Sequence, residues 1–297
     1  FALLAFSPVG TSAQIDLAGL PIHRAEAIDM DAVAADDVRR DADGELHLYA
    51  RSLALSISST SDGIWTVVDG ERICQLAVVS PGAKAMELLL EQMTVPPGAR
   101  MRVLAMDGTE RYPFFAPALP QGIHEYSTPL VYGDSWILEY REPLDAPFQG
   151  SFNVPWLNHA YREVGDSELR EGTCHVNVAC VPESMGWEDE IDATVRISVI
   201  TPQGSGWCSG TLMNNVRQDC TPYILTAWHC GRTSTTAQFN QYKFYFNFQY
   251  ATCAGGAYST SQVMTGAQLK AFSNDYAPQY QGVGGSDFML LRTNAAE

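Results

Sequence analysis

The cysteines of this 297-residue chain are distributed very unevenly, and this limits how the chain can fold. Cys74 is alone in the first 173 residues, and the other six lie between residues 174 and 253. A dense group of cysteines in one segment favours a disulfide framework, which persists in oxidising compartments. Because the total is odd, at least one thiol is free or pairs outside this chain. The six are Cys174, Cys180, Cys208, Cys220, Cys230 and Cys253.

The first residues indicate export. Residues 1–6 are apolar, and small residues at 11–13 precede Gln14 in the manner of a signal-peptidase site. We therefore interpret residues 1–13 as the remnant of a signal peptide, although a frayed apolar terminus has the same composition. Beyond them no stretch is long and apolar enough to cross a bilayer, so we expect a secreted mature protein that does not bind a membrane.

The overall charge indicates which kinds of partner the protein can bind. The formal net charge is −16 at pH 7, and so acidic a chain repels phosphate backbones, so we expect no nucleic-acid partner. The chain is 46% hydrophobic and 18% charged, which favours folded cores over disorder. Its length is sufficient for two domains.

Residues 45–147 have the pattern of an all-β domain. Short apolar and alternating segments are separated by turn signals such as Ser80-Pro81-Gly82, which predicts a small β-sandwich. Its histidines, His47 and His124, are isolated. The preceding residues, 14–44, are rich in Ala and Asp with no clear period, and we interpret them as a leader segment or as a segment that becomes ordered only on contact with another part.

Residues 148–173 are interpreted as a linker, because a charged run occupies its second half. Such a segment is a plausible protease-accessible junction. Arg170 lies just before the cysteine-rich part and is our candidate for an activation cleavage site. An ordinary solvated connector explains this residue equally well.

The strongest functional signal is the segment YILTAWHC at 223–230, in which an apolar strand runs directly to His229. A general base must be held rigidly at a strand end beside a cleft. A disulfide next to the histidine is one way to fix its backbone, and Cys208, in CSGTLM at 208–213, is a suitable partner for Cys230. A lone histidine is ordinarily structural, but these neighbours favour a catalytic role.

These segments resemble the chymotrypsin-like serine proteases and, within them, the lysyl endopeptidases secreted by bacteria. The resemblance covers residue 174 to the end, with a weaker likeness to that family's pro-regions upstream. It implies an all-β fold with a β-sandwich pro-domain followed by the first β-barrel of a two-barrel protease over 174–297, the second barrel being absent. It is carried by CHVNVAC at 174–180, CSGTLMNN at 208–215, LTAWHCG at 225–231, FNFQ at 246–249 before Cys253, and SDFMLL at 286–291, and upstream by SPGA at 80–83 and VPPGA at 95–99.

The resemblance also implies roles for individual residues. His229 corresponds to the general base and Asp287 to the carboxylate that orients its ring. The implied disulfides are Cys208–Cys230 and Cys180–Cys253, with a partner for Cys174 beyond residue 297. No partner is assigned to Cys220 or Cys74.

The implied activity is hydrolysis of protein and peptide substrates after Lys or another basic residue, through a Ser-His-Asp triad and without a cofactor. The pro-domain would be a partner within the precursor, and the location would be extracellular or periplasmic.

The nucleophile departs from the family pattern, since no Gly-x-Ser-Gly-Gly motif occurs in these residues. The segment GSG at 204–206 precedes the histidine strand and is typical of a hairpin turn, and Ser209 belongs to a strand. We therefore expect a precursor that stops before its catalytic serine and is inactive as it stands.

Two other interpretations remain open. Cys174, His175 and Cys180, or His229 and Cys230, offer ligand types that zinc accepts, although the paired spacing of structural zinc sites is missing. The chain is alternatively a secreted binding module on a protease fold that has lost its serine. The presence of both His229 and Asp287 argues against this second interpretation.

Overall fold

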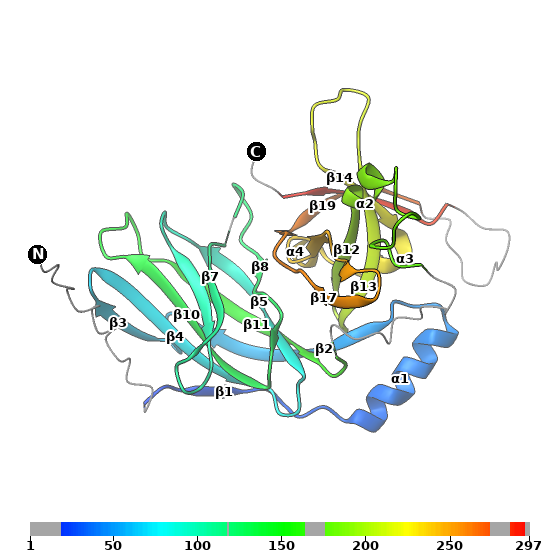
Figure 1. Ribbon diagram of the computed structural model, residues 1–297. Helices are drawn as coiled ribbons and strands as arrows, with labels where there is room; N and C mark the ends of the chain where they lie inside the picture. Colours follow the sequence, from blue (N-terminus) through cyan, green and yellow to red (C-terminus); the bar gives the residue numbers. More distant parts are fainter. Residues whose placement is uncertain (1–18, 118, 164–175, 274–285, 295–297) are drawn as a thin grey trace, which may run out of the picture.

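The computed structural model describes residues 19–117, 119–163, 176–273 and 286–294. These form an N-terminal part, residues 19–163, and a C-terminal part, residues 176–294, which lie side by side in Figure 1. The described chain is mostly β-strand, as predicted. The expected signal remnant 1–13, the cleavage candidate Arg170 and Cys174 lie outside the described residues.

The N-terminal part consists of two sheets. The first has the order β1-β4-β10-β6-β7, with β3 also paired to β4. The second contains β2, β11, β5 and β8 in that order, with β9 paired to β5. The strands of the first sheet are β1 Ile22–Arg24, β3 Ile64–Val68, β4 Glu71–Val79, β6 Arg100–Leu104, β7 Glu110–Phe115 and β10 Ser135–Pro143. Those of the second are β2 Leu48–Ser58, β5 Ala85–Thr94, β8 Tyr126–Ser127, β9 Val131–Tyr132 and β11 Ser151–Ala160.

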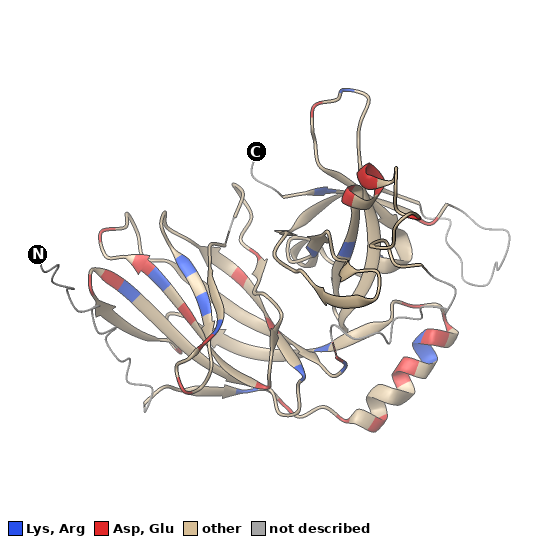
Figure 2. Ribbon diagram, viewed as in Figure 1, with Lys and Arg blue, Asp and Glu red and all other residues tan. Residues whose placement is uncertain are grey.

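One apolar core joins these two sheets. Alternate residues of β4, such as Leu76 and Val78, are buried with alternate residues of β5, such as Leu88 and Leu90. This period of two places one face of each sheet against the other. Charged residues recur along the strands of the first sheet, where they form the red and blue segments of Figure 2, and several of them pair across neighbouring strands, as Arg102 does with Glu139.

Two segments differ from their sequence interpretation. Residues 30–42 of the expected leader form helix α1 (Met30–Ala42), where the Asp29 side chain caps the first turn by accepting from two backbone N–H groups. Ten residues of the expected linker form β11, which lies between β2 and β5 in the sheet. A register shift between Val154 and Trp156 interrupts the alternation of buried and exposed residues in β11, and the strand also buries the polar side chain of Asn158. The sequence of β11 therefore lacks the regular apolar alternation by which a strand is recognised.

The C-terminal part is a nearly closed barrel. Its strands follow the order β18-β15-β12-β13-β14-β20-β19, and their inward side chains form a second core. The bounds are β12 Thr194–Thr201, β13 Gly204–Met213, β14 Tyr223–Ala227, β15 Lys243–Phe246, β18 Val263–Thr265, β19 Ala267–Phe272 and β20 Phe288–Thr293. A hairpin, β16 Tyr250–Thr252 and β17 Gly255–Tyr258, and helices α2 Glu188–Ala193, α3 Trp228–Gly231 and α4 Thr236–Phe239 complete it.

The two parts share a continuous sheet, because the start of β13 pairs with β2. No helix within the described ranges is long and apolar enough to cross a membrane.

Candidate active site

The strand-to-histidine segment folds as the sequence predicted. β14 ends at Ala227, and His229 lies in the single turn α3 that follows. β14 is held on both sides, by β13 and by β20, so the position of His229 is fixed by the body of the barrel.

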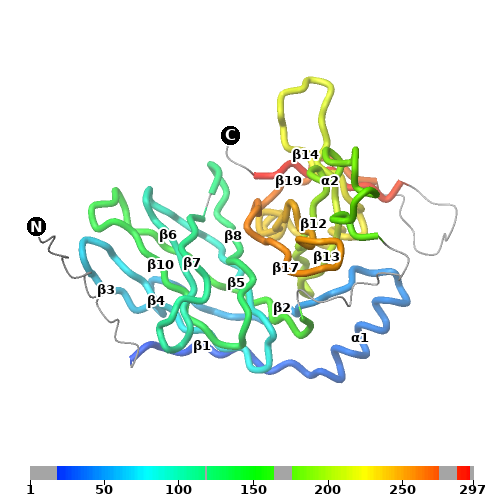
Figure 3. Tube along the Cα trace, in the orientation of Figure 1, coloured from blue at the N-terminus to red at the C-terminus, as the bar shows by residue number. Residues whose placement is uncertain are grey.

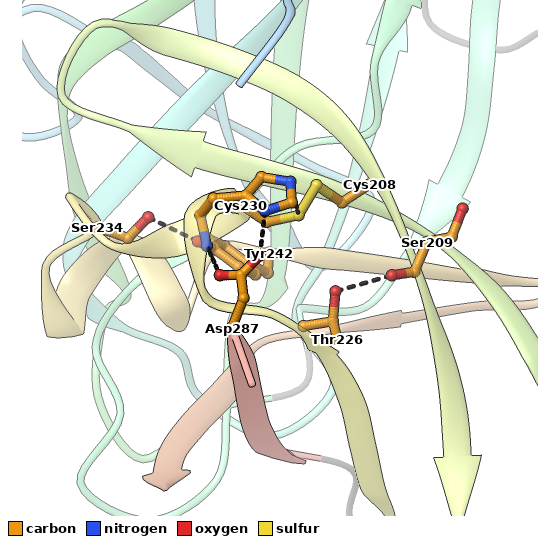
Figure 4. Close-up of a disulfide and its surroundings, with 8 residues drawn as sticks. Cys208, Ser209, Thr226, Cys230, Ser234, Tyr242 and Asp287 are labelled. Carbon is orange, nitrogen blue, oxygen red and sulfur yellow. Dashed lines mark hydrogen bonds and ion pairs between the residues drawn. A yellow bond between two sulfur atoms is a disulfide. The ribbon is translucent and has the colours of Figure 1, made fainter. Parts of the chain in front are cut away.

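Asp287 lies against this turn from the opposite strand. Its Oδ2 accepts a hydrogen bond from Nδ1 of His229 at 2.6 Å, and its Oδ1 accepts from the backbone N–H of His229 at 3.0 Å. Its carbonyl oxygen accepts from the backbone N–H of Trp228 at 2.9 Å. The carboxylate therefore binds both the ring and the backbone of the histidine, which fixes the orientation of the imidazole (Figure 4).

The backbone of Asp287 is in the left-handed region, with φ of 41°. Aspartate accepts this conformation more readily than most residues, but the conformation still carries strain. Asp287 directly precedes β20, which starts at Phe288, so the strained residue turns its carboxylate toward α3 at the point where pairing with β14 begins.

The hydrogen bond also determines the tautomer. An ionised carboxylate only accepts hydrogen bonds, so Nδ1 of His229 is the donor, and in the neutral form of the ring Nε2 is left with the lone pair. The side chains of His229 and Asp287 are 36% and 23% exposed, which leaves the pair half-buried at the surface of the barrel. A base held in this way can abstract a proton at Nε2 while Asp287 stabilises the charge on the ring.

The two disulfides that the resemblance implied are both present. Cys208 of β13 is bonded to Cys230 of α3, next to His229, and Cys180 is bonded to Cys253. Within the described ranges Cys74 and Cys220 are free, the first buried and the second exposed.

The serines near the histidine have other roles. Ser234 donates to the carbonyl of Ile200 at 2.7 Å and lies 2.6 Å from the Tyr242 hydroxyl. Ser209 belongs to β13, and its carbonyl accepts from the Thr226 hydroxyl at 2.7 Å. Figure 4 shows Ser209 beyond Thr226, on the side away from Asp287. This agrees with the interpretation of Ser209 as a strand residue.

The structure adds a neighbour that the sequence did not reveal. A cavity of about 280 Å³ has His229 and Cys230 in one wall and residues of α1, including Asp36 and Arg40, in the other. Figures 1 and 3 show α1 lying next to the C-terminal part, although the two are far apart in the sequence. Part of the segment that we interpreted as a leader, helix α1, therefore lies beside the candidate general base, His229.

The charges of α1 are arranged as a network around Asp36. Burial raises the pKa of this carboxyl, but hydrogen bonds from Arg51, Arg39 and Arg40 outweigh that effect and hold the pKa well below its usual value of 3.8. Because Arg51 belongs to β2, this network ties α1 to the sheet that both parts share.

The geometry does not support a zinc site at these cysteines. Among the described residues, Cys208, His229 and Cys230 form the one group of three with suitable ligand atoms. Zinc binds thiolate sulfur, and both of these sulfurs are bonded in a disulfide. Cys180 is also bonded, and His175 lies outside the described residues.

Residues 169–297 match the family model of the lysyl endopeptidase C-terminal domain. This part of the chain is lysyl endopeptidase-like. The match supports a protease, that is, a hydrolase, and it covers both His229 and Asp287. The lysyl endopeptidase-like part begins a few residues before the described C-terminal part and includes every strand of the barrel.

Proposed function

We propose that this chain belongs to the precursor of a secreted serine endopeptidase that cleaves after Lys or another basic residue. The observation that carries the proposal is the double hydrogen bond between Asp287 and His229, within a part of the chain that is lysyl endopeptidase-like. The same arrangement of a carboxylate and a tautomer-fixed imidazole is what a serine nucleophile requires of its base.

In the proposed reaction, Nε2 of His229 takes the proton of a serine hydroxyl as that oxygen attacks the peptide carbonyl. His229 then returns the proton to the leaving amine, and water releases the acyl group by the same steps. Asp287 holds the ring throughout and stabilises its charged form. The serine is assigned to a second barrel beyond residue 297, because no Gly-x-Ser-Gly-Gly motif lies within these residues.

The N-terminal part is proposed to be the pro-domain. The contact of α1 with the cavity at His229 supports a role in restricting access to the site before activation. Arg170 is retained as the proposed activation site. The two disulfides favour an oxidising location, for which we propose secretion, and the net charge of −16 favours the approach of cationic substrates.

The test is the hydrolysis of peptide substrates that differ only in Lys, Arg or Leu before the cleaved bond, using the product of the complete natural gene. We expect cleavage after the basic residues, loss of cleavage in His229→Ala, and retention in Ser209→Ala, a matched change on the neighbouring strand. Correctly folded wild-type protein that cleaves none of the substrates would support the binding-module interpretation instead.

A further inference from the structure

A second cavity lies between the two parts, and neither candidate catalytic residue lines it. Its volume is about 200 Å³, and eight of the residues that line it are aromatic. These rings come from both parts: Tyr126 and Tyr132 belong to the N-terminal part, and Trp207 and Phe248 to the C-terminal part. A cavity with this lining can take up a ring by stacking and apolar contact.

Arg196 lies at the edge of this cavity. Its neighbours on β12, Val195 and Ile197, are buried in the core of the barrel, so Arg196 lies on the barrel's outer face. Its guanidinium carbon is 3.8 Å from the centroid of the Trp207 ring and 4.3 Å from that of the Phe248 ring. Because both rings line the cavity, these cation–π contacts place the guanidinium against its wall.

The two rings that contact Arg196 are themselves held in place. The Trp207 ring stacks on Tyr49, with centroids 4.6 Å apart and the planes 19° from parallel. The centroid of the Phe248 ring lies 4.5 Å from that of Tyr258. The guanidinium is therefore positioned before any ligand arrives, which lowers the entropy that binding costs.

The charge of Arg196 is not neutralised within the protein. In the part of the chain that the structure describes, its side chain forms no hydrogen bond and no ion pair, although Asp and Glu outnumber Lys and Arg by 34 to 18. Burial lowers the pKa of Arg196, as expected for a cation with no carboxylate beside it. Lys243 also lines the cavity, but its charge is paired with Glu87.

We propose that this cavity binds a small aromatic carboxylate, with the ring among the aromatic side chains and the carboxylate on the guanidinium of Arg196. A guanidinium can donate to both oxygens of a carboxylate at once, and its positive charge strengthens these hydrogen bonds. A volume of about 200 Å³ suits one ring with a short side chain. Because neither His229 nor Asp287 lines the cavity, the proposal stands or fails independently of the proposed catalysis.

The experiment titrates the full chain with 3-phenylpropionate at pH 7 by calorimetry, and then with 3-phenylpropanamide, the uncharged amide of the same shape. We expect the acid to bind at least roughly tenfold more tightly than the amide, because hydrogen bonds between charged groups are stronger. Arg196→Gln should abolish that difference. The control is Arg217→Gln, an exposed arginine on the loop after β13, which should leave both affinities unchanged.

The comparison of acid and amide needs no variant, so the test stays informative if Arg196→Gln fails to fold. The proposal is wrong if the wild-type protein does not bind the acid, or binds the acid and the amide equally well. It is also wrong if folded Arg196→Gln keeps the wild-type preference for the acid. Galacturonate, a carboxylate on a sugar ring, should bind more weakly than 3-phenylpropionate, and tighter binding of the sugar would overturn the aromatic class of ligand.

Discussion

The buried ion pair between Lys243 and Glu87 offers the most direct test of how the N-terminal and C-terminal parts are held together. Lys243 lies on β15 of the barrel and Glu87 on β5 of the sandwich, and their side chains are 4% and 1% exposed. The ammonium of Lys243 donates to Glu87 and to the hydroxyl of Ser127. Burial lowers the pKa of Lys243, and the carboxylate of Glu87 opposes that shift. The ion pair is therefore desolvated and bridges the junction.

The change to make is Lys243→Met, which retains much of the side chain's bulk and removes its charge. It leaves the carboxylate of Glu87 buried, where it still accepts a hydrogen bond from the Asn158 amide at 3.0 Å but has lost its cation. Breaking a buried pair by removing one partner costs about 3–5 kcal/mol of folding free energy. Replacing both charges by neutral groups, in Lys243→Met with Glu87→Gln, is expected to cost much less, because no buried charge is left.

The measurement is equilibrium unfolding of the full chain in urea, followed by tryptophan fluorescence. Lys84→Met is the matched control, since Lys84 forms an exposed pair with Glu163 at 3.4 Å, and exposed pairs contribute at most about 1 kcal/mol. The reasoning is refuted if Lys243→Met is no more destabilising than Lys84→Met. It is equally refuted if adding Glu87→Gln to Lys243→Met restores no stability.

Three further results are expected. Replacing Cys208 and Cys230 by Ala should lower the free energy of unfolding by about 3 kcal/mol, since the bond closes a loop with a sequence separation of 22 residues; an unchanged thermal midpoint would contradict this. Because the folded-state pKa of Asp36 is held below 3.8, its stabilisation of α1 is complete above about pH 4 and is lost as the pH falls toward the folded-state value. The protection of α1 against hydrogen exchange, taken relative to the intrinsic exchange rate at each pH, should therefore fall below pH 4, and Asp36→Asn should remove most of that pH dependence; wild-type protection that does not change with acid would refute it. Peptide mapping after treatment with a thiol reagent should find Cys220 modified in the folded protein. Cys74, whose pKa burial raises to about 12, should react only on unfolding, so early labelling of Cys74 would contradict the buried position.

The sequence contained the local signals of the site but not its surroundings. The apolar strand before His229 and the neighbouring Cys230 are local signals, so the strand end and a disulfide beside the histidine could be predicted from the residues. The role of Asp287 was implied only by the family resemblance, because its contact with His229 joins residues 58 positions apart in the chain. The left-handed backbone of Asp287 could not be predicted, because it lies just before the point where β20 meets β14, a strand some sixty residues earlier in the chain.

The links between the two parts were not predictable from local patterns. The sequence of β11 buries Asn158 and contains a register shift, so it lacks the clean alternation that identifies a strand. The helix α1 is tied to the sheet by ion pairs such as that between Arg51 and Asp36, which depend on the tertiary fold. Gly204 and Gly206 were interpreted as turn residues because glycine is common in turns. In the structure they begin β13, where a Cβ atom would lie 1.9 Å from the carbonyl oxygen of Ala50 at Gly204 and 2.6 Å from that of His47 at Gly206.

The central claim is that His229 and Asp287 serve a serine nucleophile, and covalent labelling tests it most directly. The product of the complete natural gene, activated and folded, is treated with a phosphonate probe that reacts with activated serines. We predict stoichiometric labelling of a serine, with no labelling in His229→Ala and labelling slowed by roughly 10⁴-fold in Asp287→Asn, as expected when the base loses its tautomer-fixing carboxylate. Folded wild-type protein that remains unlabelled, or His229→Ala protein that is labelled at the wild-type rate, would contradict the claim.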